Sequence, residues 1–174
     1  MPIFNVVRAR RNREGYMENL ISNMYTEESV IYRMGYGICA VNADTIISSF
    51  YYTRNTFCSN NSIKVHQMEI YIEKEFGIEE TIRIADAFGS YILGLGFQVF
   101  TSTLDSDNYY LITIAVNAIS FMNGKAFHDN NMQYVNICNY LKSIVPYDWE
   151  FEVTDNTFFN PEDGSNNYIH GILM

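Results

Sequence analysis

The sequence has few basic residues and no long hydrophobic run. It contains 11 Lys and Arg against 20 Asp and Glu, a net charge of −9 at pH 7, so most of its surface should repel the phosphates of nucleic acid. No apolar run approaches the ~20 residues that cross a bilayer. Residues 1–7 also lack the basic segment that precedes the apolar core of a signal peptide. We therefore expect a cytoplasmic protein with no membrane partner.

Cysteine is scarce, and several motifs of nucleotide-binding proteins and hydrolases are missing. The three cysteines, Cys39, Cys58 and Cys138, are an odd number without the spacing of a metal site, which favours reduced thiols. The sequence has no Gly-x-Gly-x-x-Gly turn and no Gly-x-x-x-x-Gly-Lys-Ser/Thr loop, the motifs that bind dinucleotides and nucleotide phosphates. It also has no Gly-x-Ser-x-Gly elbow, which carries the nucleophile of many hydrolases.

The composition is that of a globular domain rich in aromatic residues. Hydrophobic residues make up 48% of the chain, charged residues 18% and aromatic residues 16%, which argues against disorder. A chain of 174 residues can bury a substantial single core, and no linker divides it. We expect one domain over residues 1–153 and an acidic, Asn-rich C-terminal tail over residues 154–174.

Hydrophobic periodicity predicts alternating strands and helices. Strands are expected over residues 3–9, up to residue 37, and over 63–73, 97–104, 109–119 and 149–153. Helices are expected over residues 14–24, 42–57, 79–95 and 131–144. Asn42 should cap the second helix. The last helix should bury a stripe formed by Met132, Val135, Cys138 and Leu141.

The order of these elements predicts an α/β (α+β) fold, with a central, mostly antiparallel sheet of about five strands flanked by helices. Residues 97–104 and 109–119 form a hairpin within it. Along the second strand of this hairpin, Ile112 and its period-two neighbours should be buried. The opposite face, which ends at Asn117, mixes side-chain sizes and carries an amide, so chemistry would sit there.

Four segments occur in this order: Tyr36-Gly37-Ile38-Cys39, Thr53-Arg54, Val65-His66-Gln67-Met68-Glu69-Ile70, and Val116-Asn117-Ala118-Ile119-Ser120-Phe121 followed by Gly124-Lys125. Taken together, they resemble segments of the mobilisation relaxases, the HUH-type DNA-nicking domains of conjugative plasmids and transposons. The resemblance covers roughly residues 18–145. It implies a relaxase-like sheet and a protein of a plasmid or integrative mobile element.

The resemblance also implies where a metal site would lie. Relaxases of this type hold a divalent metal with a His-x-His pair on one strand and a third histidine on the neighbouring strand, two residues before an Asp. Here Asp105 matches that Asp and Thr103 the third histidine, while the pair falls on Leu111 and Thr113. A shift of one residue places the pair on Tyr110 and Ile112 instead. None of these is a histidine, so we expect no metal and no other cofactor unless the protein is an active, divergent relaxase.

The nucleophilic tyrosine of the family would fall near Leu20. Tyr16, one helical turn earlier, and Tyr25, just beyond the helix, are the candidates to replace it, although a structural role is the favoured interpretation of each. His66 matches a family position but is better interpreted as a hydrogen-bonded core imidazole. His66 and Asp105 alone would form only a partial metal site. We expect His128 and His170 to be solvated.

A basic segment near the N-terminus is the candidate DNA contact. It comprises Arg8, Arg10, Arg11 and Arg13. These side chains could touch the phosphates of single-stranded DNA, but the favoured interpretation is a solvated strand end and turn.

Three functions remain open at this point. The first is a relaxase homologue that lacks the metal-dependent transesterase site and binds single-stranded DNA or other conjugation or mobilisation proteins. The second is an active, divergent relaxase that nicks single-stranded DNA through a tyrosine. The third is a protein-binding accessory module without DNA contact.

Overall fold

The computed structural model describes residues 1–8, 11–145 and 147–154. In chain order its elements are β1 (Ile3–Val7), α1 (Tyr16–Thr26), β2 (Val30–Tyr36), α2 (Ala43–Thr56), β3 (Val65–Glu73), the 3-10 turn η1 (Lys74–Phe76), α3 (Ile78–Gly94), β4 (Val99–Asp105), β5 (Tyr109–Asn117), α4 (Asn131–Ile144) and β6 (Glu150–Thr154). The predicted mixture of strands and helices is confirmed. The tail expected over 154–174 lies outside the described residues from position 155 onward.

The strands form one six-stranded sheet in the order β2-β4-β5-β3-β1-β6. Neighbouring strands are antiparallel except β1 and β6, which are parallel. The sheet has one strand more than the predicted five or so, because β2 is a full strand paired with β4 along its length. The β4–β5 hairpin and β3 occupy the centre of the sheet.

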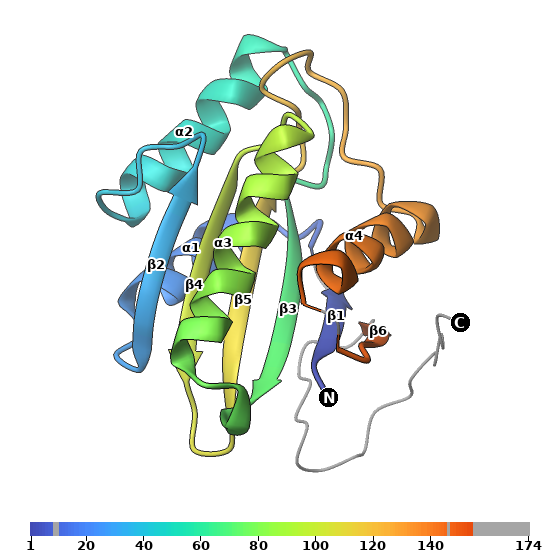
Figure 1. The fold of residues 1–174 in the computed structure, drawn as a ribbon. Coiled ribbons are helices and arrows are strands. Elements are labelled where there is room, and N and C mark those ends of the chain that lie inside the picture. Colours follow the sequence, from blue (N-terminus) through green and yellow to red (C-terminus); the bar gives the residue numbers. More distant parts are fainter. Residues whose placement is uncertain (9–10, 146, 155–174) are drawn as a thin grey trace.

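Helices cover both faces of the sheet (Figure 1). One face carries α3 and α4, and it buries the larger core, which includes Phe4, Met68, Phe88, Ile114 and Leu141. The other face carries α1 and α2, which close a smaller core over the middle of the sheet. We call these the α3 face and the α1 face. Because side chains alternate along each strand, the residue before or after a core residue on one face points to the other face.

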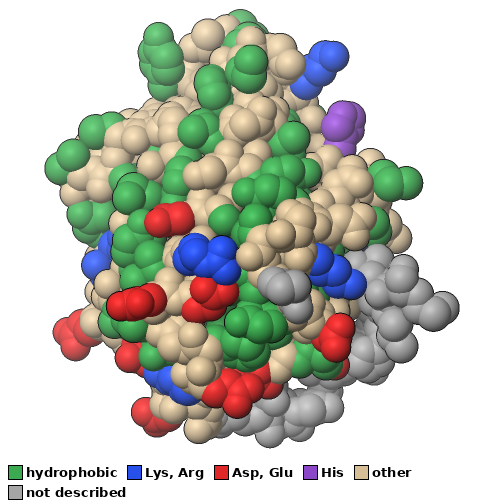
Figure 2. Space-filling view, in the orientation of Figure 1, with side chains coloured by type: hydrophobic (Ala, Val, Ile, Leu, Met, Phe, Trp, Pro, Cys, Tyr) green, Lys and Arg blue, Asp and Glu red, His purple; other side chains and the backbone are tan. Residues whose placement is uncertain are grey.

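Charge is unevenly distributed over the α3 face. In Figure 2, Asp and Glu side chains lie towards the end of the molecule at which β1 begins. At the opposite end of the same view, where α2 and the loop between β5 and α4 lie, hydrophobic side chains are visible and carboxylates are not. The carboxylates visible in this view therefore lie towards one end of the face.

Asn42 caps α2 as the sequence predicts. Its side chain accepts a hydrogen bond of 2.9 Å from the backbone N–H of Thr45, and the Thr45 hydroxyl accepts one of 3.1 Å from the backbone N–H of Asn42. This capping box satisfies two donors that a helix start leaves without an intrahelical partner.

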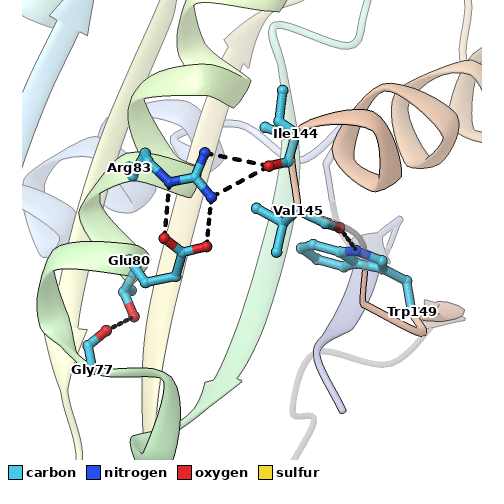
Figure 3. A network of polar contacts seen from close by, with 7 residues as sticks. Gly77, Glu80, Arg83, Ile144, Val145 and Trp149 are labelled. Carbon is cyan, nitrogen blue, oxygen red and sulfur yellow. Dashed lines mark hydrogen bonds and ion pairs between the residues drawn. The ribbon is translucent and has the colours of Figure 1, made fainter.

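A guanidinium joins α3 to the end of α4 (Figure 3). Arg83 is held by Glu80 one turn earlier on α3, at 2.6 and 2.8 Å, and donates twice to the carbonyl of Ile144 at 3.3 Å. The last carbonyls of a helix lack intrahelical donors, so Arg83 satisfies one of them from a neighbouring helix. The indole N–H of Trp149 donates to the next carbonyl, that of Val145, at 3.4 Å.

The predicted buried stripe of α4 is only half right. The buried residues are Tyr134, Ile137, Cys138 and Leu141, whereas Met132 is 69% exposed and Val135 is half-buried. A tyrosine was not an obvious core residue, but its hydroxyl donates to Asp129, which removes the penalty of burying it. Once Tyr134 faces the sheet, the stripe shifts by about one residue around the helix.

No helix among the described residues is long and apolar enough to span a bilayer. The longest one is α3, with 17 residues.

Candidate functional site

The pairing of β4 with β5 determines the sheet face of each position at which the relaxase resemblance implies a metal ligand. Thr103 is paired with Ile112, and Ser102 is paired with Thr113. Thr103 therefore faces α3 together with Ile112, while Leu111 and Thr113 lie on the α1 face. The three positions do not converge. The register that shares a face with Thr103 is the shifted one, which uses Tyr110 and Ile112.

Packing and an ion pair occupy these positions. Thr103 and Ile112 are fully buried, and the Thr103 hydroxyl has no hydrogen-bond partner among the described residues. Asp105, at the end of β4, forms an ion pair with Lys74, whose ammonium also lies 4.0 Å from the ring centroid of Tyr110. Across the described part of the chain, no three His, Cys, Asp or Glu side chains gather closely enough to hold a metal ion.

A row of polar side chains crosses the α1 face of the sheet instead. Strand pairing aligns Arg33 with Ser102, Ser102 with Thr113, Thr113 with Glu69 and Glu69 with Asn5, so the row runs from β2 to β1. On this face α1 contacts β2, β4 and β5. The hydrogen bonds of the row concentrate at its β3 and β1 end.

Glu69 is the centre of that hydrogen-bond network. Its carboxylate accepts from Gln67 Nε2 at 2.7 Å, from Asn5 Nδ2 at 3.1 Å and from the Tyr71 hydroxyl at 2.8 Å. Tyr16, the first residue of α1, donates its hydroxyl to Gln67 Oε1. Three strand residues thus donate to a single carboxylate, and Tyr16 of α1 joins them through Gln67; we call this set the Glu69 network.

The Tyr16 phenol is held in its protonated form. Burial, and secondly the negative charge of Glu69, raise its pKa to about 12, although Arg11 acts in the opposite direction. The acceptor of the phenol proton is an amide oxygen, which is not a base. Nucleophilic tyrosines need a base, a metal or a lowered pKa. The network can therefore position donors and acceptors, but it does not activate Tyr16.

The network also leaves an acceptor without a partner. Asn5 is fully buried, and while its Nδ2 donates to Glu69, its Oδ1 has no hydrogen-bond partner among the described residues. A buried amide oxygen without a donor costs roughly 1–3 kcal/mol. A bound donor at this point of the α1 face would remove that cost.

Tyr25, the second candidate nucleophile, lies at the other end of α1. Its hydroxyl donates to the carbonyl of Val41, its ring stacks on Phe100 with centroids 6.3 Å apart, and the guanidinium of Arg33 lies 5.4 Å from the ring centroid. These contacts attach the end of α1 to the sheet and to the segment before α2. Because α1 rises about 1.5 Å per residue, Tyr16 and Tyr25 begin roughly 13 Å apart and do not share a site.

The basic segment is partly neutralised. Both Arg8 and Arg11 pair with Asp129, just before α4, at 3.2 Å for Arg8, and Tyr134 donates its hydroxyl to the same carboxylate. The hydrogen bonds from Tyr134 and Arg11 outweigh the effect of burial and lower the pKa of Asp129. Arg13 is exposed at the start of α1. Arg10 lies outside the described residues.

His66 is buried on the α3 face as predicted, but it is not the fully hydrogen-bonded core imidazole that we expected. Its ring packs on Phe127 with centroids 5.0 Å apart, and its Nδ1 has no partner among the described residues. Burial lowers its pKa to about 4, against the opposing effect of the Asp129 carboxylate. His66 pairs with Val116 and Asp105 with Tyr110, so roughly 20 Å of β5 separates them and they form no partial metal site. His128 is exposed as predicted, and His170 lies outside the described residues.

Asn117 is the amide on the strand face where the sequence predicts chemistry, but its role in the structure is to hold elements together. It is fully buried and donates to Gln98 Oε1 at 2.8 Å and to the carbonyl of Phe50 at 3.3 Å. Gln98 Oε1 also accepts from the Thr53 hydroxyl at 2.9 Å. These bonds attach α2 to the hairpin.

Sequence reasoning missed Asn5, Gln67 and Tyr71 as members of a site. Alternation along β3 does predict that Gln67, Glu69 and Tyr71 share the face away from His66, but it does not indicate that they form a site. What no local pattern reveals is that Tyr16 and Asn5 reach this group, because the pairing of β1 with β3 brings together residues 64 positions apart.

Comparison with known proteins adds no family to this geometry. No protein-family model, no curated protein and no solved structure matches the chain.

Proposed function

We propose that this chain is a relaxase-like protein of a mobile element that lacks the metal-dependent transesterase site. In this proposal it serves as an accessory binding protein alongside nicking enzymes, and the Glu69 network occupies the sheet face on which it binds. Its compartment would be the cytoplasm, which agrees with three cysteines that are all free thiols.

The observation that carries the proposal is the state of Tyr16. The phenol donates to the neutral amide of Gln67, and burial beside Glu69 raises its pKa to about 12, so it stays protonated at neutral pH. Together with Thr103, which is packed beneath α3, this arrangement supports binding by hydrogen bonds over attack on a phosphate.

A nicking assay tests the loss of catalysis. Purified protein would be incubated with a pool of labelled single-stranded oligonucleotides and Mg²⁺ or Mn²⁺, and adducts resolved on a denaturing gel. We expect no covalent adduct from the wild type. A metal-dependent adduct that Tyr16→Phe abolishes, while Tyr25→Phe leaves it unchanged, would overturn the proposal and establish a divergent active relaxase.

A binding assay tests the DNA contact. We expect weak retention of a single-stranded oligonucleotide near ~20 mM salt and loss of binding by ~200 mM, because few phosphate contacts oppose a net charge of −9. Arg13→Gln, next to Tyr16, should weaken binding severalfold. Arg83→Gln is the matched control, because Arg83 is 51% exposed on α3, on the opposite face, and should have no effect.

A second function, protein binding without DNA contact, is favoured by the pairing of Arg8 and Arg11 with Asp129. That carboxylate already neutralises part of the charge that DNA would use. If the wild type shows no DNA retention even near ~20 mM salt, this second function replaces DNA contact in the proposal.

A further inference from the structure

An uncharged apolar patch lies at the end of the molecule where α2 and α3 finish. It consists of five large side chains with much of their surface exposed: Tyr52 (75%), Phe57 (37%), Leu95 (41%), Phe121 (39%) and Met122 (67%). We call this set the apical patch. It belongs to three separate elements, the last turns of α2, the end of α3 and the loop after β5.

Glycines bring these elements together. A Cβ on Gly124 would lie 2.6 Å from the ring of Phe57, and a Cβ on Gly96 would lie 2.9 Å from the sulfur of Met122. Both glycines have positive φ, at 70° and 89°, which other residues rarely adopt. Phe57 and Met122 therefore pack directly against the backbone of Gly124 and Gly96, where any larger residue would collide with them.

Backbone hydrogen bonds hold the patch in one shape. The N–H of Phe121 donates to the carbonyl of Gly96 at 3.0 Å, and the N–H of Gly124 donates to the carbonyl of Ser120 at 3.0 Å. The N–H of Met122 donates to the Ser120 hydroxyl at 3.2 Å. A surface already ordered in the free protein loses less conformational entropy when it binds.

Two grooves meet beside Tyr52. One, of about 260 Å³, lies between Tyr52, Phe57 and Phe121, and the other, of about 630 Å³, runs along α2 past Ser48 and Ser49. Among the described residues, none that lines either groove carries a formal charge at neutral pH. Tyr52 lines both, so a projecting aromatic ring stands next to two open grooves.

We propose that the apical patch is the interface of a homodimer with twofold symmetry, in which Tyr52 of each copy enters the groove beside Tyr52 of the other. A twofold interface pairs a surface with itself, which requires a projection and a hollow on the same patch. Two copies that each carry −9 repel over most of their surfaces, and an uncharged patch is where they can meet without opposing carboxylates. Tyr, Phe and Met are enriched in such interfaces. The inference goes beyond the proposed function and does not depend on it.

Two methionines give a matched test. Met122 lies in the apical patch and is 67% exposed, whereas Met132 lies on α4, outside the patch, and is 69% exposed. Sedimentation and light scattering from about 1 µM to about 1 mM would follow the mass of the wild type, Met122→Glu and Met132→Glu. We expect the wild type and Met132→Glu to rise from 20.2 kDa to twice that mass, 40.4 kDa, and Met122→Glu to stay monomeric.

Each other outcome also decides the question. A wild type that stays monomeric throughout, a mass that rises without reaching a plateau at the dimer, or a Met122→Glu variant that dimerises like Met132→Glu would overturn the proposal. If Met122→Glu lost its native circular dichroism, Tyr52→Ser would replace it, because Tyr52 is 75% exposed and its removal leaves the core intact. That variant must also abolish the dimer.

Discussion

At the scale of single residues, the polar groups without partners are the informative ones. His66 Nδ1, Thr103 Oγ1 and Asn5 Oδ1 are all buried without a hydrogen-bond partner among the described residues. Buried polar atoms are almost always satisfied, so each such atom adds a cost that the fold must offset elsewhere. Thr103, one of these residues, occupies the position at which the relaxase resemblance implies a metal ligand.

The pKa of His66 predicts a pH dependence of stability. The folded protein keeps the imidazole neutral down to about pH 4, whereas the unfolded chain protonates it near ~6.5, so protons favour unfolding between these values. The charges that reach it are those of Asp129, Arg8 and Arg11. We expect the free energy of unfolding to fall by about 1.3 kcal/mol between pH 7.5 and pH 5.5, and to fall further towards pH 4.

Urea titrations at the two pH values measure this change. His66→Gln should remove most of the dependence, and His128→Gln, at an exposed position, should keep it. An unchanged dependence in His66→Gln would show that other groups cause it.

At the scale of elements, α3 shows how much a helix depends on one small residue. The sequence predicts this helix and its end, and the helix runs from Ile78 to Gly94. It does not predict that the ring of Tyr36 lies against Gly89, where an added Cβ would be 2.1 Å from a ring carbon. The Tyr36 hydroxyl donates to Asp86 at 2.5 Å, which holds the ring in place.

We expect Gly89→Ala to destabilise the fold by roughly 1–3 kcal/mol, because the methyl group must displace a ring that Asp86 holds. The control is Gly94→Ala on the same helix, where nothing lies within 4 Å of the added Cβ. That change should be neutral or stabilise by up to ~1 kcal/mol through helix propensity. Equilibrium unfolding of both variants measures the difference, and equal effects would show that Tyr36 moves aside freely.

Asn42 tests how much a predicted cap contributes. Asn42→Ala removes the side-chain oxygen that accepts from the Thr45 backbone N–H and should cost ~1 kcal/mol, whereas Asn42→Asp keeps this acceptor and should cost little. Thermal or urea unfolding of the pair measures this. A loss of the same size in both variants would assign the effect to something other than the cap.

At the scale of the whole molecule, the net charge of −9 should oppose folding at low ionic strength. We expect the unfolding midpoint to rise when NaCl increases from ~10 mM to ~150 mM, because the Debye length falls from ~30 Å to ~8 Å. Scanning calorimetry at constant pH measures it. A falling midpoint would mean that the ion pairs of Asp129 with Arg8 and Arg11 outweigh the general repulsion.

The class of fold and most of its elements follow from the amino-acid sequence alone. Period-two and period-3.6 patterns are local, so the central strands, α1, α3 and the Asn42 cap could be read within a few residues of their observed positions. The stripe of α4 was misread because a buried tyrosine depends on Asp129, which lies outside the helix.

The candidate site could be located only once the strands were paired in space. Side chains alternate along a strand with a period of two, so a shift of one residue in the pairing of β4 with β5 moves each side chain to the other face. The sequence does not fix that pairing to within one residue. Pairing in space then placed Thr103 beneath α3, joined Asn5 directly and Tyr16 through Gln67 to Glu69, and assembled the apical patch from three separate segments. These contacts join residues far apart in the chain, and no local pattern encodes them.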